Sequence, residues 1–526
     1  METKQNPDMS LARTATLRWK RIFMKLMPPP QISKAAMPTF TRLLLPLLFF
    51  CSSLSASHAD NLLTNSGFED GLTGWTAAPA NAAMFQVTPE AASMGKMGLH
   101  AGAATDDQET TTATLSSAAF PVVPAKIYRL TIWGRLHGPA KCPVEIQLQF
   151  AGQDGKVIDP VITPSYWPLN VPRAEHQFDK LIMQAAAPAG AVSVVALISV
   201  HGASHGGADL DDFSLEEIPA AAAVKTPLPA PLPDAEIQAL LTEIKSLPFR
   251  GKAPPKVVIK VDDFAGNWAK PPIKQVHHHW LRIANFTAQR KIKLSIGIIA
   301  KSLEVSEQPV FDWVKKDHDS GLFEFWLHGY DHVPWIGPDG KQMPEGRGRS
   351  AEEQTQRLAT CQKLAEDKLG FHFVSYGPTG SGPQPLIDQA FMDSLQNDPY
   401  IKNIMYPWPI DQMGKDLQAK GKVVVLDRVN SVNIEAAVGH PRFDVFLEGY
   451  AHNRDRDYFI IQGHPALWGW DDTPKNEAFG NFVKIIDFLT SQNVTFVFPS
   501  ELAESLAATH AYTTNSAAVA PPQKGP

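Results

Sequence analysis

The chain has 526 residues, of which 44% are hydrophobic and 19% are charged. This length exceeds that of one ordinary domain, and the hydrophobic content is sufficient for more than one core. The formal net charge of −6 at pH 7 gives no electrostatic reason to expect a nucleic acid or an anionic membrane surface as a partner. Composition therefore favours a multidomain globular protein that does not bind nucleic acid.

Residues 1–59 predict an N-terminal extension and a signal peptide. Arg42 precedes the apolar run Leu43–Phe50, and small and polar residues follow as far as Ala59. A basic region, a hydrophobic region and a small-residue cleavage site in this order are typical of export signals. The run is short for a membrane span. We therefore expect a periplasmic or secreted protein with no stable membrane span after cleavage before Asp60, and an uncleaved anchor is the alternative.

Residues 60–218 predict an all-β domain. Short runs of alternating apolar and polar residues are separated by Gly, Pro, Asn and Asp, which is typical of strands joined by turns. The runs that indicate strands are Ala113–Leu115, Tyr128–Trp133, Val144–Phe150 and Ala191–Ser199. The pattern favours a β-sandwich.

The two ends of this domain resemble those of galactose-binding-like jelly-roll modules, which include many carbohydrate-binding modules. The opening segment carries Phe68 and Trp75, and the closing segment is Asp209–Leu215. The resemblance implies a jelly-roll sandwich that is carbohydrate-binding-like, with a structural calcium ion held by Glu69 and Asp211. Solvated turn acids are an equal alternative for these two residues, and the domain could also serve as a spacer.

Residues 219–255 predict a linker followed by a helix. The first part is rich in Pro and Ala, which is typical of a semi-rigid spacer. Asp234 is a candidate N-cap for an amphipathic helix that continues to Leu247.

Residues 256–508 predict an α/β barrel, because apolar strand candidates alternate with helical patterns. The strand candidates are Lys256–Val261, Lys293–Ile299, Phe323–Leu327, His372–Tyr376, Asn403–Tyr406, Val423–Leu426, Phe459–Ile461 and Val494–Phe498. The helical patterns include Gln275–Gln289, Ala351–Leu369 and Ala478–Ser491. Residues 509–526 are rich in Ala, Thr and Pro, and we expect a disordered tail there.

Polar residues follow four of these strands directly. Asp262 and Asp263 follow the first, His328 the third, Gly377 the fourth and His464 the seventh. The carboxyl ends of parallel strands meet at one rim of a barrel, where active sites form. One Asp with two His is a ligand set for zinc and related divalent metals. The sequence therefore predicts a metal-dependent hydrolase.

These motifs resemble those of the polysaccharide deacetylase family, also known as carbohydrate esterase family 4. The resemblance implies that Asp262 is the general base and that Asp263 is a metal ligand together with His328 and His332, four residues apart. His464 in Gly-His-Pro matches the general acid. The family implies a distorted (β/α)7-type barrel, a divalent metal (zinc, with cobalt or nickel as alternatives) and removal of acetyl groups from a polysaccharide or oligosaccharide.

The chain departs from the family at the third motif, which usually carries an arginine that braces the base. The corresponding segment Ser375–Gly382 has no arginine. Within it, the N–H of Gly377 is a candidate oxyanion donor. Trp468 and Trp470 follow His464 and are candidates for a wall that contacts the sugar.

Two further points concern the scope of these predictions. The tandem residues His277–His279 fall inside a helical pattern, so we do not expect all three to face one way.

Two other functions stay open: a metal-dependent amidohydrolase that acts on a non-glycan amide in the same barrel, and a non-catalytic glycan-binding surface protein.

Overall fold

The computed structural model describes residues 61–77, 83–102, 112–137, 144–162, 177–201, 207–219, 231–247, 253–264, 271–380, 385–407, 410–429, 431–468 and 477–517. These residues all belong to one compact unit, Ala59–Pro526. The signal peptide predicted over residues 1–59 lies outside the described residues, so export stays a prediction.

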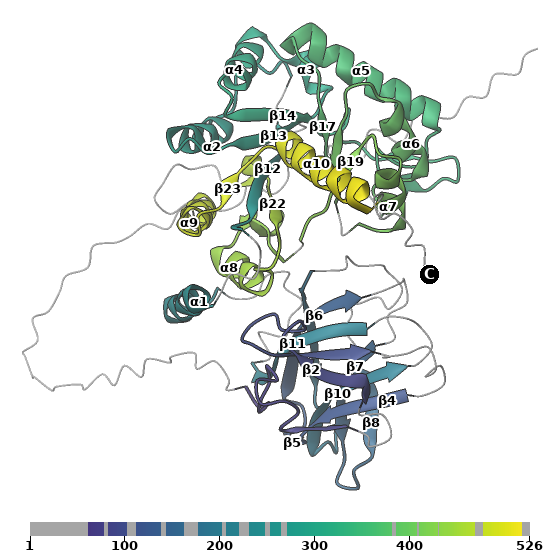
Figure 1. The fold of residues 1–526 in the computed structure, drawn as a ribbon, viewed down its shortest axis with the longest axis vertical. Helices are drawn as coiled ribbons and strands as arrows, with labels where there is room; N and C mark the ends of the chain where they lie inside the picture. Colours follow the sequence, from purple (N-terminus) through teal and green to yellow (C-terminus); the bar gives the residue numbers. More distant parts are fainter. Residues whose placement is uncertain are drawn as a thin grey trace, which may run out of the picture. The chain divides into compact units, whose positions relative to one another are not determined.

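The N-terminal part of the described chain contains two antiparallel sheets (Figure 1). One sheet has the order β1 (Trp75–Ala77), β4 (Thr112–Ser117), β10 (Ser193–His201), β7 (Val144–Ala151) and β8 (Val157–Ile162), with β5 (Phe120–Pro121) beside β10. The other has the order β2 (Phe85–Thr88), β3 (Gly98–Gly102), β11 (Gly207–Ile218), β6 (Ile127–His137) and β9 (Asp179–Ala186). Apolar side chains of both sheets share one core. The all-β prediction is confirmed, whereas jelly-roll connectivity stays a prediction.

A bulge in β11 explains how the closing segment packs. Leu210 and Phe213 are three residues apart, so a regular strand would place them on opposite faces. The pairing register shifts between Asp211 and Ser214, and Asp212 has a φ of 50°. Both apolar side chains are therefore buried. The Phe213 ring lies edge-on to Trp75 and to Phe68, with centroid distances of 5.2 and 5.6 Å.

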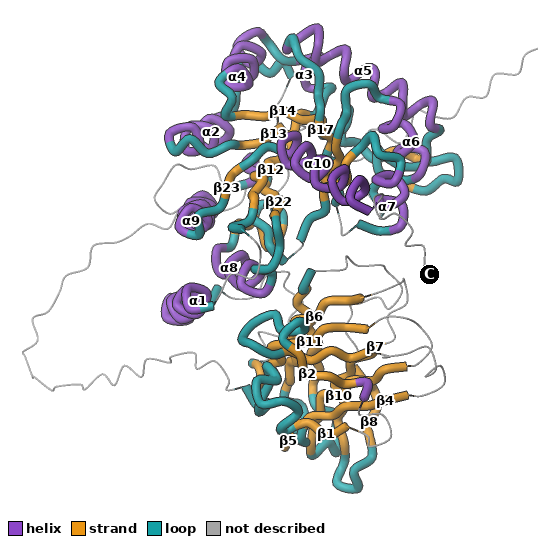
Figure 2. The backbone as a smooth tube through the Cα atoms, viewed as in Figure 1, coloured by secondary structure: helices purple, strands orange, loops and turns teal. Residues whose placement is uncertain are grey.

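The C-terminal part contains a parallel sheet that forms an open half-barrel (Figures 1 and 2). Its order is β19 (Val424–Leu426), β18 (Asn403–Met405), β17 (Ser375–Tyr376), β14 (Phe323–Leu327), β13 (Leu294–Ile298), β12 (Lys256–Phe264) and β22 (Tyr458–Gly463), with β23 (Thr495–Phe496) beside β12. Among the described residues no pairing joins β19 to β22. Seven strands on one parallel path agree with the expected barrel type.

Helices alternate with these strands, as the sequence predicts. The longer ones are α2 (His278–Gln289), α4 (Gln308–Asp319), α5 (Ala351–Leu369), α6 (Gln389–Asn397), α7 (Gln412–Ala419), α8 (Phe443–His452), α9 (Glu477–Ser491) and α10 (Pro499–Ala517). Shorter elements are α3 (Ser302–Val305), η4 (Pro465–Leu467), and the two-stranded ribbons β15 (Trp335–Ile336) with β16 (Gln342–Met343) and β20 (Glu435–Ala437) with β21 (His440–Pro441). Helix α1 (Asp234–Ser246) begins after Pro233, so Asp234 belongs to its first turn and is not the cap.

Helix α10 packs against the face of the parallel sheet that turns away from the main core. Leu502 and Ala503 of this helix join Val258, Trp326 and Ile460 in one apolar cluster. The helix continues past residue 508, where the sequence predicted the barrel to end and a disordered tail to begin. The strand expected over His372–Tyr376 is shorter than predicted, because only its last two residues pair with neighbouring strands.

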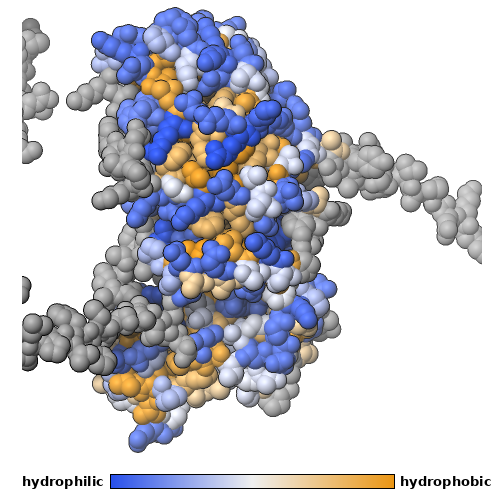
Figure 3. All heavy atoms as spheres, turned by 90° about the vertical axis from the view of Figure 1, so that its left-hand side faces the viewer, coloured by the Kyte–Doolittle hydropathy of each residue, from blue (hydrophilic) through white to orange (hydrophobic). Residues whose placement is uncertain are grey.

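Figure 3 shows one face of the molecule, on which hydrophilic and hydrophobic side chains alternate over short distances. Within the described residues, no helix combines the length and the apolar character that crossing a membrane requires.

Candidate metal and catalytic site

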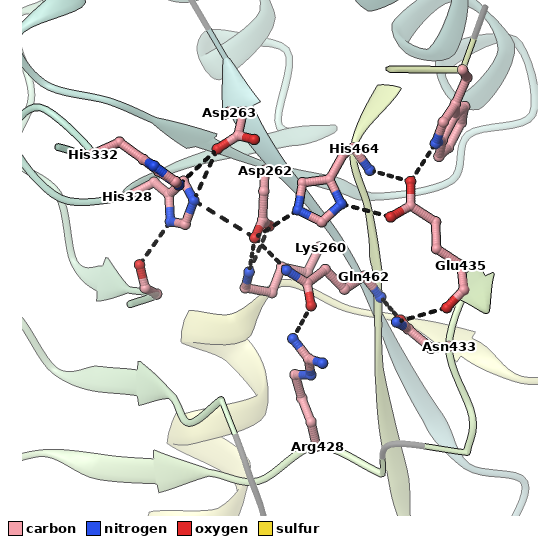
Figure 4. A network of polar contacts seen from close by, with 12 residues as sticks. Lys260, Asp262, Asp263, His328, His332, Arg428, Asn433, Glu435, Gln462 and His464 are labelled. Carbon is pink, nitrogen blue, oxygen red and sulfur yellow. Dashed lines mark hydrogen bonds and ion pairs between the residues drawn. The ribbon is translucent and has the colours of Figure 1, made fainter. Parts of the chain in front are cut away.

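The alternation of side chains along two neighbouring strands builds the floor of the site. Residues two apart on a strand share a face, so Lys260 lies below Asp262 on β12. Strand β22 pairs with β12 in parallel register, with Gln462 opposite Lys260. His464 follows β22 and continues the same face beside Asp262. Figure 4 shows these side chains pointing toward one another at the carboxyl ends of the strands, where the sequence predicts the site.

A bulge at the end of β12 allows two consecutive carboxylates to enter one site. In a regular strand Asp262 and Asp263 would point to opposite faces. The pairing register shifts between Val261 and Phe264, and Asp263 has a φ of 70°. The left-handed backbone conformation costs about 1–2 kcal/mol for a residue with a Cβ. Such conformations concentrate at functional sites.

Asp263, His328 and His332 form the predicted ligand triad. The Oδ1 atom of Asp263 lies 3.2 Å from Nε2 of His328 and 3.3 Å from Nε2 of His332. Tetrahedral zinc with bonds of roughly 2.0–2.1 Å keeps neighbouring ligand atoms about 3.3 Å apart. Asp263 Oδ1 therefore lies at the zinc-ligand spacing from both histidine nitrogens, and the three ligand atoms all lie within 4.8 Å of one another.

The hydrogen bonds of the triad also fit a cation. Nδ1 of His328 lies 2.8 Å from the carbonyl oxygen of Gly377. A carbonyl only accepts hydrogen bonds, so Nδ1 carries the proton and Nε2 presents a lone pair. No donor among the described residues bonds the buried Oδ1 of Asp263. Nε2 of His328 and Oδ1 of Asp263 therefore face each other as two acceptors. A divalent cation between them would stabilise this arrangement.

A buried carboxylate that sequence reasoning missed holds the loop of the second ligand. Glu345 accepts hydrogen bonds from the backbone N–H groups of Tyr330, at 2.5 Å, and of His332, at 2.8 Å. Arg357 on α5 donates to the same carboxylate at 3.0 Å. His332 has a φ of 57°, so this bracing stabilises a backbone conformation that the residue rarely adopts.

The second carboxylate, Asp262, is held by Lys260 and Gln462. Nζ of Lys260 lies 2.5 and 2.6 Å from the two carboxylate oxygens, and the amide nitrogen of Gln462 lies 2.5 Å from Oδ2. Burial opposes ionisation, but the Lys260 ammonium lowers the pKa of Asp262. Lys260 also lies over the ring of Trp326, 4.5 Å from its centroid. This is a signal the sequence offered, because a lysine inside an apolar strand needs a buried partner.

His464 is oriented by Glu435, another carboxylate that sequence reasoning missed. Glu435 accepts from the backbone N–H of His464 at 2.7 Å, and its Oε2 lies 2.6 Å from Nδ1 of the ring. Nε2 then points toward Asp262, 3.9 Å from its Oδ2. Burial lowers the pKa of His464, but the contacts with Glu435 and Asp262 raise it overall.

Two substrate-binding predictions are wrong. The N–H of Gly377 donates to the carbonyl of Leu327 at 3.0 Å, so it is not an oxyanion donor, and its carbonyl orients His328 instead. Trp468 is only 4% exposed, and its indole N–H donates to Glu435, so it supports the His464 partner and does not form a sugar wall. Trp470 lies outside the described residues.

The prediction for His277–His279 is also wrong. Helix α2 begins at His278, and His277 precedes it as the N-cap with an extended backbone. The three imidazoles are therefore not spread around one helix, and a ligand nitrogen of each lies within 4.8 Å of the others.

The proposed calcium residues have backbone partners. Glu69 accepts from the N–H groups of Lys96 and Met97, and Asp211 accepts from those of Ser93 and Met94. Burial raises the pKa of Asp211 to about 7. Both carboxylates thus hold the same loop. No group of three metal-ligating side chains among the described residues includes them, and calcium binding stays a prediction.

Comparisons with known proteins give distant similarities. No family model and no curated protein matches the chain. A family 4 acetyl xylan esterase from Clostridium thermocellum, solved with a cobalt ion, is 14% identical, with 47% of this chain and 89% of that chain covered and a TM-score of 0.29. Puue allantoinase is 13% identical, with 50% and 95% covered and a TM-score of 0.37. TmCBM61 in complex with β-1,4-galactotriose is 21% identical, with 30% and 99% covered and a TM-score of 0.22.

Substituting Gly329 tests the bracing of the ligand loop. Gly329 has a φ of 71°, and a Cβ there would lie 2.6 Å from both Glu345 Oε2 and Thr379 Cγ2. Gly321 has a φ of 70° with nothing within 4 Å of its added Cβ. We expect Gly329→Ala to lose zinc and to lower the free energy of unfolding by more than Gly321→Ala, which carries only the backbone strain of about 1 kcal/mol. Zinc content and urea unfolding measure the difference, and equal effects would contradict the bracing role.

Proposed function

We propose that this protein is a metal-dependent hydrolase that removes acetyl groups from a carbohydrate. The observation that carries the proposal is the convergence of Asp263, His328 and His332, in which Asp263 Oδ1 lies 3.2 and 3.3 Å from the two histidine nitrogens. A separate carboxylate and a separate histidine flank this triad. The carbohydrate substrate rests on the motifs around Asp262, His328 and His464, which resemble those of the deacetylase family although Phe264 replaces the glycine that usually follows the acidic pair.

Asp263, His328 and His332 would hold the divalent ion. Zinc fits the donor set best, and cobalt or nickel use the same donors. When bound there, such an ion polarises the acetyl carbonyl and makes water a better nucleophile.

Asp262 fits the role of general base. It is ionised, because Lys260 lowers its pKa, and it lies 3.7 Å from His328 through Oδ2. The carboxylate is therefore next to the triad and ready to accept a proton from the attacking water. Lys260 and Gln462 fix its orientation, which keeps both oxygens from rotating away.

His464 fits the role of general acid. Its Nδ1 faces Glu435 and its Nε2 faces the site, so a proton on Nε2 can pass to the departing amine or alkoxide. The raised pKa of His464 keeps the ring protonated at a higher pH than an ordinary histidine.

Lys260 supplies the cation that the arginine of the third family motif usually supplies. Its ammonium bonds both oxygens of Asp262 from within the same strand. A Cβ at Gly377 would lie 3.1 Å from Lys260 Cε and 2.5 Å from the Trp326 ring. The glycine in the third segment therefore leaves room for the lysine that takes over the bracing of the base.

Separate substitutions of the two adjacent aspartates distinguish their roles. We expect Asp263→Ala to lose both zinc and hydrolysis, because it removes a ligand. Asp262→Asn should keep zinc but lower kcat by roughly 10²–10⁴-fold, the usual contribution of a general base. Acetate release from acetylated oligosaccharides and metal analysis of the same samples provide the readouts, with Asp319→Asn on the surface as the control.

Two results would overturn the assignment: metal retained in Asp263→Ala with full hydrolysis, or full activity after chelation in the wild type. Release of ammonia from linear or cyclic amides, without acetate release from any acetylated glycan, would favour the amidohydrolase alternative. Tight glycan binding by zinc-loaded protein without turnover would favour the non-catalytic one.

The pH profile of Glu435→Gln tests the general acid. Glu435 raises the pKa of His464, and the acid works only while it is protonated. Activity is therefore present below that pKa and lost as pH rises through it. Without the carboxylate the pKa of His464 falls, so the alkaline limb of kcat should move to lower pH. Glu366→Gln on the exposed face of α5 should leave the limb in place, and an unmoved limb in Glu435→Gln would exclude the pairing.

Substitution of Lys260 tests the bracing of the base. Lys260→Ala leaves a space beside Asp262, and we expect lower kcat with zinc retained and KM little changed. Ethylammonium should restore part of the activity by occupying this space. Lys260→Met fills the same volume without a charge, so it should lose activity and not respond to the amine. Wild-type kcat in Lys260→Met would show that the ammonium has no role in the reaction.

A further inference from the structure

The first turn of α2 carries a cluster of three imidazoles, His277, His278 and His279, that the proposed hydrolysis does not use. A regular helix rotates each residue by about 100°, which would separate their side chains. The backbone of His277 is instead extended, with φ −65° and ψ 144°. This turn returns its ring to the other two, and one ligand nitrogen of each lies within 4.8 Å of the others.

The three rings surround a common point and do not form a stack. The centroid distances are 4.2 Å for His277 and His278, 4.6 Å for His277 and His279, and 4.2 Å for His278 and His279. The last two pairs are nearly perpendicular, at 81° and 72°. His279 is buried, whereas His277 and His278 are exposed. His279 is thus fixed by packing, and Nδ1 of His277 accepts from the backbone N–H of His279 at 3.4 Å, so His278 is the ring with the most freedom to turn toward an ion.

We propose that His277, His278 and His279 form a second divalent metal site, separate from the one at Asp263. A set of three neutral imidazoles selects zinc, nickel, copper or cobalt, and not calcium or magnesium, which take oxygen ligands. Zinc keeps its ligand atoms about 3.3 Å apart, so the exposed rings turn to close the cluster around the ion, and His277 exchanges the 3.4 Å contact between its Nδ1 and the His279 N–H for the metal. Water completes the coordination on the exposed side.

This site binds metal more weakly than the triad. It contributes no carboxylate, and the partial positive charge at the start of a helix opposes a cation. The first equivalent of zinc therefore fills the Asp263 site and the second fills the histidine cluster. The next residue, Trp280, packs edge-on against Phe264 at 5.3 Å. Because Phe264 follows Asp263 on β12, an ion that orders the start of α2 also stabilises the element that carries the first site.

Metal titration of the untagged full chain tests the second site. Equilibrium dialysis with zinc should give two equivalents for the wild type. The double variant His277→Asn, His278→Asn should keep one equivalent of zinc and full acetate release. The control variant His318→Asn should keep two equivalents of zinc. The single variants His277→Asn and His278→Asn should each lower the affinity for the second zinc ion by at least about tenfold. Loss of a residue that only orients a metal ligand already has an effect of this size. One equivalent in the wild type would overturn the site, as would a second equivalent unaffected by either single variant.

A spectroscopic readout separates this proposal from the hydrolase assignment. Wild-type protein with one equivalent of zinc already bound should take up Cu(II) with electron paramagnetic resonance splitting from several nitrogens. The same signal should appear in the double variant Asp263→Ala, His332→Ala, which lacks the first metal site. His277→Asn with His278→Asn should abolish it. A signal from one nitrogen only, or one that survives the double substitution, would show adventitious binding. None of these results depends on catalytic activity.

Discussion

The left-handed backbone of Asp263 is the constraint on which the site depends. It ends the regular alternation of β12 and brings two adjacent carboxylates into one space. One of them faces His328 and His332, and the other faces Lys260 and His464. Without this bulge, either the ligand or the base would point into the apolar layer beneath the helices. The backbone strain is offset by the contacts that both carboxylates make.

Asp262 and His464 each contact a buried partner that shifts its pKa: Lys260 lies beside Asp262, and Glu435 lies beside His464. Lys260 lowers the pKa of Asp262, and Glu435 raises the pKa of His464, each against the effect of burial. These partners lie on different elements, one on β12 and one on β20. Environments that push the pKa values of two groups apart allow both to act at one pH. The partners therefore matter to the chemistry as much as the two residues they hold.

Much of this arrangement could be predicted from the sequence, because strands that end in polar residues indicate a barrel rim. The positions of Asp262, Asp263, His328 and His464 follow from that pattern, and the structure brings them together. Their bracing could not be predicted in the same way. Glu345 comes from a segment between β16 and α5, and Glu435 begins the short strand β20. The approach of both to the site depends on the tertiary fold.

Other residues were misassigned because sequence patterns do not report direction. Trp468 follows His464 by four residues, but its indole turns into the core. Gly377 offers its carbonyl and not its N–H to the site. The three tandem histidines gather because α2 begins at His278, three residues after the predicted helical pattern begins at Gln275, which leaves His277 outside the helix. In each case the local direction of the backbone decides where the group points. The periodicity of apolar residues in the sequence does not determine that direction.

The most direct test of the metal site is an anomalous difference map from crystals of the zinc-loaded protein, recorded on both sides of the zinc absorption edge. We expect a peak with bonds of about 2.0–2.2 Å to the Asp263 carboxylate and to Nε2 of His328 and His332, next to the carboxylate of Asp262. A map with no peak among these three side chains, from protein that releases acetate, would contradict this assignment.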